Sequence, residues 1–254
     1  MESKYESLGL SLEEPELSNQ ISIRILFGQE AIKDQNSIRL ITELYAQVFA
    51  GPPWNEFSRC PRCGKFYGQD NPIGSFSSCC KQQLVEAYPL EETINYIEAE
   101  LGKLNAVLAY LSRPNGKIIG FAWGYQTTSQ EFANEKYQTG EMRETIINLL
   151  SSARLPEKSL VYYFSECGVA EEHRGRRYAN ELTQAMVDAA QSLGLPLLMR
   201  TNSQSPMVAV AQKFRMTQCF GQEVIYQDGQ IITTGNTVNG LDKENSNRVL
   251  FLKI

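Results

Sequence analysis

Apolar and polar positions along the chain change their period several times, and these changes divide it into strands and helices. Residues 160–169 form an apolar run rich in aromatic and β-branched side chains, which predicts a buried strand. Over residues 179–193 the apolar positions recur every three or four residues, which is typical of a helix with one buried face. Gly194 and Pro196 end that pattern, and residues 196–200 form a second apolar strand. The region therefore predicts a strand, a short basic turn, a helix and a strand.

The same periodicities assign elements to the rest of the chain. Strands are expected over 21–27, 106–112, 117–126, 223–227, 230–234 and 248–254, and helices over 38–49, 88–102, 127–158 and 205–216. Asn36 or Ser37 is expected to cap the first helix, and residues 235–247 to form a polar loop. This order predicts an α/β or α+β fold, with a mixed sheet flanked by helices. Residues 1–19 are polar and acidic and are expected to be a flexible tail, which leaves residues 20–254 as one domain.

Composition and charge narrow the classes of partner. The chain has 254 residues, of which 42% are hydrophobic, and this is enough for a sizeable core. The net charge of −5 argues against a general nucleic-acid binder. No apolar run reaches membrane-spanning length, and the first residues lack the core of a signal peptide. We therefore expect a cytoplasmic protein with no membrane or nucleic-acid partner.

The basic turn before the helix at 179–193 has the chemistry of an anion site. A helix N-terminus leaves several backbone N–H groups without intrahelical partners and carries a partial positive charge. Gly175 permits close approach of the backbone, and Arg174, Arg176 and Arg177 add positive charge. From the turn alone, a phosphate site and a solvated connection stay equally open.

The stretch from Val169 to Leu182, V-A-E-E-H-R-G-R-R-Y-A-N-E-L, resembles the acyl-CoA-binding signature of the GNAT superfamily of N-acetyltransferases. The family pattern Gln/Arg-x-x-Gly-x-Gly/Ala falls here on residues 174–179. The resemblance implies a GNAT-type acyltransferase fold, acetyl-CoA as co-substrate, and an enzyme that transfers the acetyl group to a primary amine. It also implies that the strand end binds the pantetheine arm and the turn binds the pyrophosphate. The cofactor-binding residues implied in this way are Cys167, Val169, Arg174, Gly175, Arg176, Arg177, Tyr178 and Ala179.

Two positions depart from the family pattern. Arg177 stands where the family has its central glycine, and its cation either strengthens the phosphate contact or crowds it. Many members carry, in the helix that follows, a tyrosine that protonates the departing thiolate, and that position is Ala211 here. Either the thiolate leaves unassisted, another residue serves, or catalysis is weak. A non-catalytic acyl-CoA-binding or sensor protein is therefore the alternative function.

The resemblance also places a catalytic carboxylate. Some family members hold one where this chain has Glu166, which would take a proton from the attacking amine directly or through water. The competing interpretation is a carboxylate at a strand edge that points to solvent, because the sequence does not show which strand face Glu166 occupies. Tyr162 and Tyr163 are the nearest alternative hydroxyls.

The acceptor side is less defined by the sequence. In the family, the loop after the first helix helps to wall the acceptor site, which makes Trp54, Asn55 and Glu56 candidates there. The competing interpretation is a proline-rich turn with Trp54 packed beneath it. The acceptor itself is a small-molecule or peptide amine of unknown identity. A homodimer is possible, because C-terminal strands of this family often exchange between subunits.

Residues 57–82 form a cysteine-rich insert. Cys60 and Cys63 with Gly64 have the spacing of a zinc knuckle, and Cys79 and Cys80 follow at an interval seen in structural zinc sites. The second pair is adjacent, so both of its thiols can bind one ion only if a turn aims them at it; the alternative is that one of them binds metal and the other packs. Disulfides, free thiols and a redox pair are alternatives. The segment is therefore expected to bind a structural zinc ion, or to serve as a docking module for a protein partner.

Overall fold

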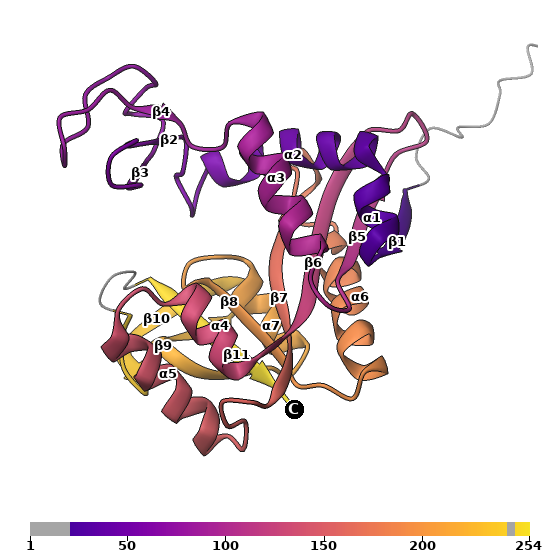
Figure 1. Cartoon of the computed structure of the whole chain (residues 1–254), viewed down its shortest axis with the longest axis vertical. Coiled ribbons are helices and arrows are strands. Elements are labelled where there is room, and N and C mark those ends of the chain that lie inside the picture. The colour runs from indigo at the N-terminus through magenta and orange to yellow at the C-terminus, as the bar shows by residue number, and fades with distance from the viewer. Residues whose placement is uncertain (1–20, 243–246) are drawn as a thin grey trace, which may run out of the picture.

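The computed structural model describes residues 21–242 and 247–254, so the tail predicted for residues 1–19 lies outside the described residues. An eight-stranded sheet runs through the molecule in the order β1-β5-β6-β7-β8-β11-β9-β10 (Figure 1). Its strands are β1 (Ser22–Phe27), β5 (Val107–Ser112), β6 (Ile118–Thr128), β7 (Leu160–Val169), β8 (Leu197–Asn202), β9 (Thr217–Gln227), β10 (Gln230–Val238) and β11 (Arg248–Lys253). The mixed sheet with flanking helices confirms the predicted fold class.

Strands β7 and β8 are the parallel neighbours of this sheet, and they part after a short pairing. Their register joins Tyr162–Phe164 to Leu197–Met199 and extends no further among the described residues. Beyond Phe164, β7 continues to pair with β6 alone. The two strands therefore diverge towards their carboxyl ends, and the backbone of the second half of β7 is left without a strand on that side.

Helices cover both faces of the sheet. Successive residues of a strand point to opposite faces, so each buried strand packs against helices on both sides. In β5, Val107 and Ala109 pack under α6 and α7, whereas Leu108 and Tyr110 pack under the N-terminal helices. Helices α4 and α5 cover the same face as the N-terminal helices, farther along the sheet. The helices are α1 (Gly28–Lys33), α2 (Gln35–Ala50), α3 (Leu90–Leu101), α4 (Ser129–Lys136), α5 (Gly140–Ser152), α6 (Tyr178–Ser192) and α7 (Met207–Lys213). None of the described helices is long and apolar enough to cross a membrane.

A second, small sheet stands out from the body beyond α2 and α3 (Figure 1). It consists of β2 (Ser58–Arg59), β3 (Phe66–Tyr67) and β4 (Val85–Glu86), in the order β3-β2-β4. The cysteine-rich insert forms most of this sheet and the loops between its strands. The buried core of the insert is small, so hydrophobic burial contributes little to its stability.

Three details of the predicted elements were wrong. The side chain of Asp34 caps α2, because it accepts a hydrogen bond from the Ser37 N–H at 3.3 Å, and Ser37 itself lies inside the helix. The helix expected over 127–158 is two helices, since Thr128 and Thr139 each cap a new N-terminus. The loop expected over 235–247 begins later, because β10 continues to Val238 and pairs with β9; residues 243–246 lie outside the described residues.

Helix α6 begins at an unusual backbone position. Arg177 is its N-cap and lies in the left-handed region with φ of +68°. The Arg177 carbonyl accepts the Asn180 N–H at 2.9 Å, which starts the helix. This conformation suits glycine, because a Cβ atom disfavours it. A glycine, which the GNAT signature has at this position, would adopt this backbone conformation without strain.

We predict that the strain at Arg177 is measurable. Arg177→Gly should have a free energy of unfolding higher than that of Arg177→Ala by about 0.5–1 kcal/mol, because only glycine adopts this conformation without strain. The comparison between the two variants holds the loss of the guanidinium constant. Urea unfolding followed by circular dichroism measures the difference. A glycine variant that is equal to or less stable than the alanine variant would contradict it.

Candidate active site

A β-bulge at Ser165 sets the direction of the candidate base. In the β6–β7 ladder, Phe164 pairs with Gly124 and Glu166 pairs with Trp123, so Ser165 is the extra residue. The bulge turns Ser165 and Glu166 to the same face of the sheet, towards α3. The Ser165 hydroxyl donates to Glu100 at 2.6 Å, and the Tyr96 hydroxyl donates to Glu166 at 3.1 Å. Glu166 therefore points into the molecule and not to solvent at a strand edge.

Glu100 is the centre of a buried hydrogen-bond network behind Glu166. Besides Ser165, its carboxylate accepts from Trp123 Nε1 at 2.7 Å and from Tyr125 Oη and Lys136 Nζ at 3.1 Å. Burial alone would raise the pKa of Glu100, but Lys136 and the hydrogen bonds outweigh it and lower the pKa below its usual value. Glu100 is therefore an ionised, fully partnered carboxylate.

Glu166 has the opposite electrostatic setting. Burial, with the negative charge of Glu100 as a further cause, raises the pKa of Glu166 to about 8, although Lys136 and the hydrogen bond from Tyr96 partly offset this. Its carboxyl group makes no ion pair among the described residues. A carboxylate with a pKa near 8 is a better proton acceptor than an ordinary glutamate, which is the property a general base needs.

Glu166 lines a cavity of about 370 Å³ between α2, α3, the small sheet and β7, here called the aromatic cavity. Aromatic rings dominate its wall: Tyr45, Phe49, Trp54, Phe66, Tyr88, Tyr96 and Tyr163. Charged groups alternate with the rings: Glu56, Arg59, Glu92, Lys136, Arg200 and Arg248. Of the three residues expected on the acceptor side, Trp54 and Glu56 line this cavity and Asn55 does not.

A second cavity, of about 360 Å³, lies over the basic turn and is here called the turn cavity. Of the residues implied to bind the cofactor, Cys167, Val169, Arg174, Gly175, Arg177, Tyr178 and Ala179 line it, and Arg176 does not. Buried His173 also lines this cavity, and neither of its ring nitrogens has a hydrogen-bond partner among the described residues. Burial and the nearby Arg113 lower its pKa, so the imidazole is neutral at physiological pH.

The turn presents free backbone donors to this cavity. The N–H groups of residues 175–179 donate to no other group in the described part of the chain. The Arg174 guanidinium donates from Nε to the Val169 carbonyl at 3.2 Å, which ties the turn to the end of β7. Free amides at the start of a helix, together with the positive end of its dipole, are groups that can bind a phosphate.

The two cavities meet where β7 and β8 part. A small space of about 30 Å³ between them is lined by Trp54, Glu166, Cys167, Arg200 and Met207, among others. Glu166 also lines the aromatic cavity, whereas Cys167 also lines the turn cavity. Burial raises the pKa of Cys167 to about 12, so this thiol is neutral and is no nucleophile.

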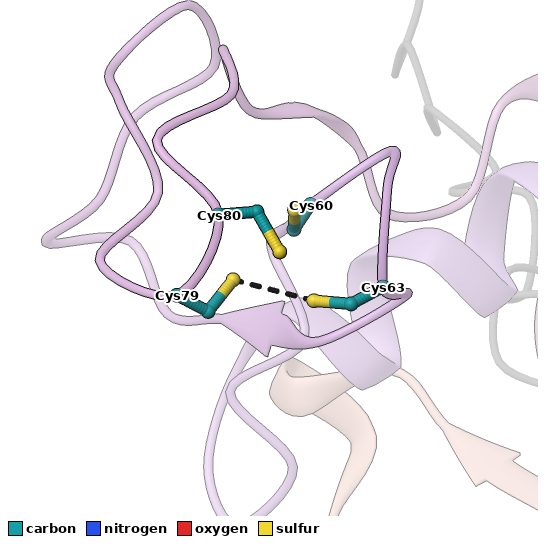
Figure 2. Close-up of side chains that lie close together, drawn as sticks. All are labelled: Cys60, Cys63, Cys79 and Cys80. Carbon is teal, nitrogen blue, oxygen red and sulfur yellow. Dashed lines mark hydrogen bonds between the residues drawn. The ribbon is translucent and has the colours of Figure 1, made fainter.

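The insert brings its four cysteines together. The sulfur atoms of Cys60, Cys63, Cys79 and Cys80 all lie within 4.8 Å of one another, and the sulfurs of Cys63 and Cys79 are 3.3 Å apart (Figure 2). Four thiolates arranged tetrahedrally at about 2.3 Å from a zinc ion would be about 3.8 Å apart. The cluster therefore fits a tetrahedral zinc site, and both adjacent cysteines point into it.

Backbone hydrogen bonds explain how Cys79 and Cys80 both face the cluster. Around the first pair, Cys60 N–H donates to the Lys65 carbonyl and Gly64 N–H donates to the Cys60 carbonyl. The second hairpin repeats this pattern, since Ser77 N–H donates to the Gln82 carbonyl and Lys81 N–H to the Ser77 carbonyl. Gly64 and Lys81 both have left-handed backbone, with φ of +73° and +56°.

The repeat assigns each cysteine a place. Ser77 occupies the position of Cys60, and Cys80 that of Cys63. Cys79 lies inside the turn, so it supplies the thiol that the position of Ser77 lacks. Of the two arrangements that the sequence left open for Cys79 and Cys80, the structure has the one with a turn, which aims both side chains at one point.

Sequence reasoning missed several residues of the aromatic cavity and of the buried network behind Glu166. Tyr96 and Glu100 lie one helical turn apart on α3, and Lys136 comes from α4 in the segment whose role the sequence left open. No motif marks them. Ala211 is fully buried in the core and offers no hydroxyl, whereas Tyr226, from β9, lines the turn cavity.

Comparison with known proteins places the chain in a family. Its residues 75–215, more than half of the chain, match the model of the acetyltransferase (GNAT) family. No curated protein sequence matches the chain.

Solved structures with a similar fold include the mosquito protein arylalkylamine N-acetyltransferase like 5b, at 14% identity and a TM-score of 0.49. The match covers 92% of this chain and 99% of that one. They also include yncA of Salmonella typhimurium with its cofactor acetyl-CoA, at 12% identity and a TM-score of 0.48, where the match covers 93% of this chain and 94% of that one. A third is a Drosophila melanogaster polyamine N-acetyltransferase, at 12% identity and a TM-score of 0.47, where the match covers 92% of this chain and 99% of that one. With TM-scores below 0.5, none of these likenesses bears on substrate or mechanism. The family match, on a chain whose β7, basic turn and α6 carry the acyl-CoA signature, shows that this protein belongs to the GNAT family of acetyltransferases.

Proposed function

We propose that the protein transfers the acetyl group of acetyl-CoA to a primary amine, with Glu166 as the general base. The observation that carries this proposal is the meeting of the two cavities at Glu166 and Cys167, where β7 and β8 part. A thioester that reaches this point from the turn cavity is adjacent to a carboxyl group that faces the aromatic cavity. The amine and the thioester therefore approach from opposite sides.

The turn cavity is the proposed acetyl-CoA site. The free amides of residues 175–179, with the guanidinium groups of Arg174 and Arg177, hold the pyrophosphate. Arg176, which does not line the cavity, adds charge at longer range. From Cys167 to Val169, the edge of β7 that β8 leaves uncovered binds the pantetheine arm, in the way that a neighbouring strand would bind it.

The proposed reaction needs one proton removed from the amine. The amine nitrogen transfers this proton to Glu166 and attacks the thioester carbon, so that a C–N bond forms. The thioester oxygen carries the negative charge until the C–S bond breaks, and a backbone N–H near Val169 stabilises it. The sulfur leaves as a thiolate, which takes up a proton. Ala211 supplies none, so the thiolate leaves unassisted or is protonated by another group.

The cysteine cluster is the proposed site of a structural zinc ion, with Cys60, Cys63, Cys79 and Cys80 as its ligands. The distances within the cluster and the small core of the insert support this role. Zinc would supply four bonds that tie the two hairpins together, in a segment where hydrophobic burial is too small to do so.

We predict that Glu166 controls the pH dependence of the reaction. Only the ionised carboxylate accepts a proton, and its pKa is about 8. In the wild type, kcat/KM should therefore rise with pH and level off above about 8. Glu166→Gln should lower kcat/KM by about 100-fold and remove this part of the profile, because an amide is no base. The release of CoA thiol over a panel of primary amines measures the rate.

Glu157→Gln is the matched control, since Glu157 is exposed in the loop after α5. Its profile should equal that of the wild type. If Glu166→Gln folds normally and keeps the wild-type rate and pH profile, Glu166 is not the base.

We predict about one zinc ion per chain, held by four thiolates. Cys63→Ser and Cys80→Ser should each lose most of the bound metal, because a serine hydroxyl is a poor zinc ligand. Cys219→Ser removes a cysteine outside the cluster and should keep the metal. Elemental analysis of the purified proteins measures the content. Metal retained at wild-type level by both cluster variants would exclude the site.

A non-catalytic acyl-CoA-binding protein is the second candidate, because buried Ala211 stands where many family members have the tyrosine that protonates the thiolate. Calorimetric titration with acetyl-CoA and the amine panel separate the two functions. Binding with turnover supports the enzyme, and binding without turnover of any amine supports the second candidate.

A further inference from the structure

The metal-binding insert contributes directly to the wall of the aromatic cavity. Arg59 of β2 and Phe66 of β3 both line this cavity. They pair with each other across the two strands, and theirs is the last pair before the knuckle that holds Cys60 and Cys63. The position of this part of the wall therefore depends on the geometry of the knuckle.

Two contacts join this part of the wall to the body of the protein. The ring of Phe66 stacks on that of Tyr88, with centroids 5.7 Å apart and planes at 27°. Arg59 forms an ion pair with Glu92 on α3 and donates to the Glu86 carbonyl from Nε at 3.3 Å. These contacts are few and partly exposed, so they orient the insert but contribute little to its stability.

The interior of the insert is too small to fix the wall without metal. Its buried apolar residues are Cys60, Tyr67 and Leu84, and the Tyr67 hydroxyl contacts the Ser78 hydroxyl at 3.2 Å in the second hairpin. Without an ion, the two hairpins lose the bonds between their cysteines. The turn cavity, by contrast, takes none of its wall from residues 57–88.

The charges of the aromatic cavity limit the ligand that it fits. Each lining cation has an acidic partner, in the pairs Arg59–Glu92, Lys136–Glu100, Arg200–Asp242 and Arg248–Glu56. No lining cation among the described residues is thus left to pair with an anionic ligand. Glu166 is the lining carboxyl group without an ion pair. Rings that surround one available carboxyl group suit an amine with a flat apolar body, held by stacking and by attraction of the ammonium to the ring faces.

We propose that the metal-held insert is the acceptor-recognition wall of the enzyme, and that this wall, through Phe66, selects a primary amine carried on an aromatic group. The inference rests on the proposed amine acetylation. It assigns the metal a role in acceptor binding and none in acetyl-CoA binding. Phe66 recognises the body of the acceptor and is not a catalytic residue.

The first experiment measures binding of 2-phenylethylamine to the CoA-saturated protein by calorimetry, so that no turnover is needed. Phe66→Ala should weaken this binding by about tenfold, because the ring loses one stacking partner. Phe76→Ala is the matched control: Phe76 lies in the same insert, is 69% exposed and does not line the cavity. It should bind as the wild type does. Zinc content and acetyl-CoA affinity should be equal in all three proteins.

The second experiment removes the metal with a chelator and restores it with zinc. Chelated protein should bind 2-phenylethylamine at least about tenfold more weakly and recover when zinc is added, with unchanged acetyl-CoA affinity. Hydrogen exchange of residues 58–67 should rise on chelation, while that of residues 175–182 should stay constant.

Either of two results overturns the inference: a wild type that does not bind 2-phenylethylamine, or equal binding by wild type, Phe66→Ala and chelated protein. Failure of this inference can be distinguished from failure of the proposed acetylation. Binding of 2-phenylethylamine without turnover of any amine would refute acetylation and keep the wall, whereas turnover of other amines without binding of this probe would refute the wall and keep acetylation.

Discussion

The hydrogen bond between Ser165 and Glu100 is the interaction on which the candidate site depends. It fixes the bulge in β7, and the bulge turns Glu166 towards α3 and the aromatic cavity. A regular strand would place Glu166 on the opposite face, beside Phe164 and the core under α6. Burial raises the pKa of Glu166, and the negative charge of Glu100 raises it further. Glu100 therefore influences both the direction and the basicity of Glu166.

The candidate site also depends on the divergence of β7 and β8. Parallel strands that stayed paired would cover the backbone of Cys167 with a neighbour and would separate the two cavities. Because the pairing ends at Phe164, the cavities meet beside Glu166. The bulge, which begins one residue later, lies at the same point. The direction of the Glu166 side chain, its raised pKa and the gap between β7 and β8 thus all arise within a few residues of β7.

Local patterns in the sequence predicted much of this architecture. The boundaries of β7 were predicted as the structure has them, because a long apolar run between polar segments leaves little choice. The basic turn was recognisable because its residues are contiguous. The bulge was not, since the apolar run before Ser165 has no alternation that an extra residue would interrupt, and only the pairing with β6 reveals that residue. Tyr96 and Lys136 reach Glu166 from distant elements, and pairings between distant elements leave no local signal.

The insert illustrates the same limit and has a consequence for the history of the protein. The adjacent cysteines left open whether one or both face a metal site, and only the repeated hairpin pattern, with Ser77 in place of Cys60, shows why both face the cluster. The insert leaves the body after α2 and returns before α3, and it packs on neither core layer of the large sheet (Figure 1). Substitutions on its cavity-facing side leave the packing of β7, the bulge and the turn untouched. With the insert as the proposed acceptor wall, selection can change the acceptor without changing the residues proposed for the chemical step.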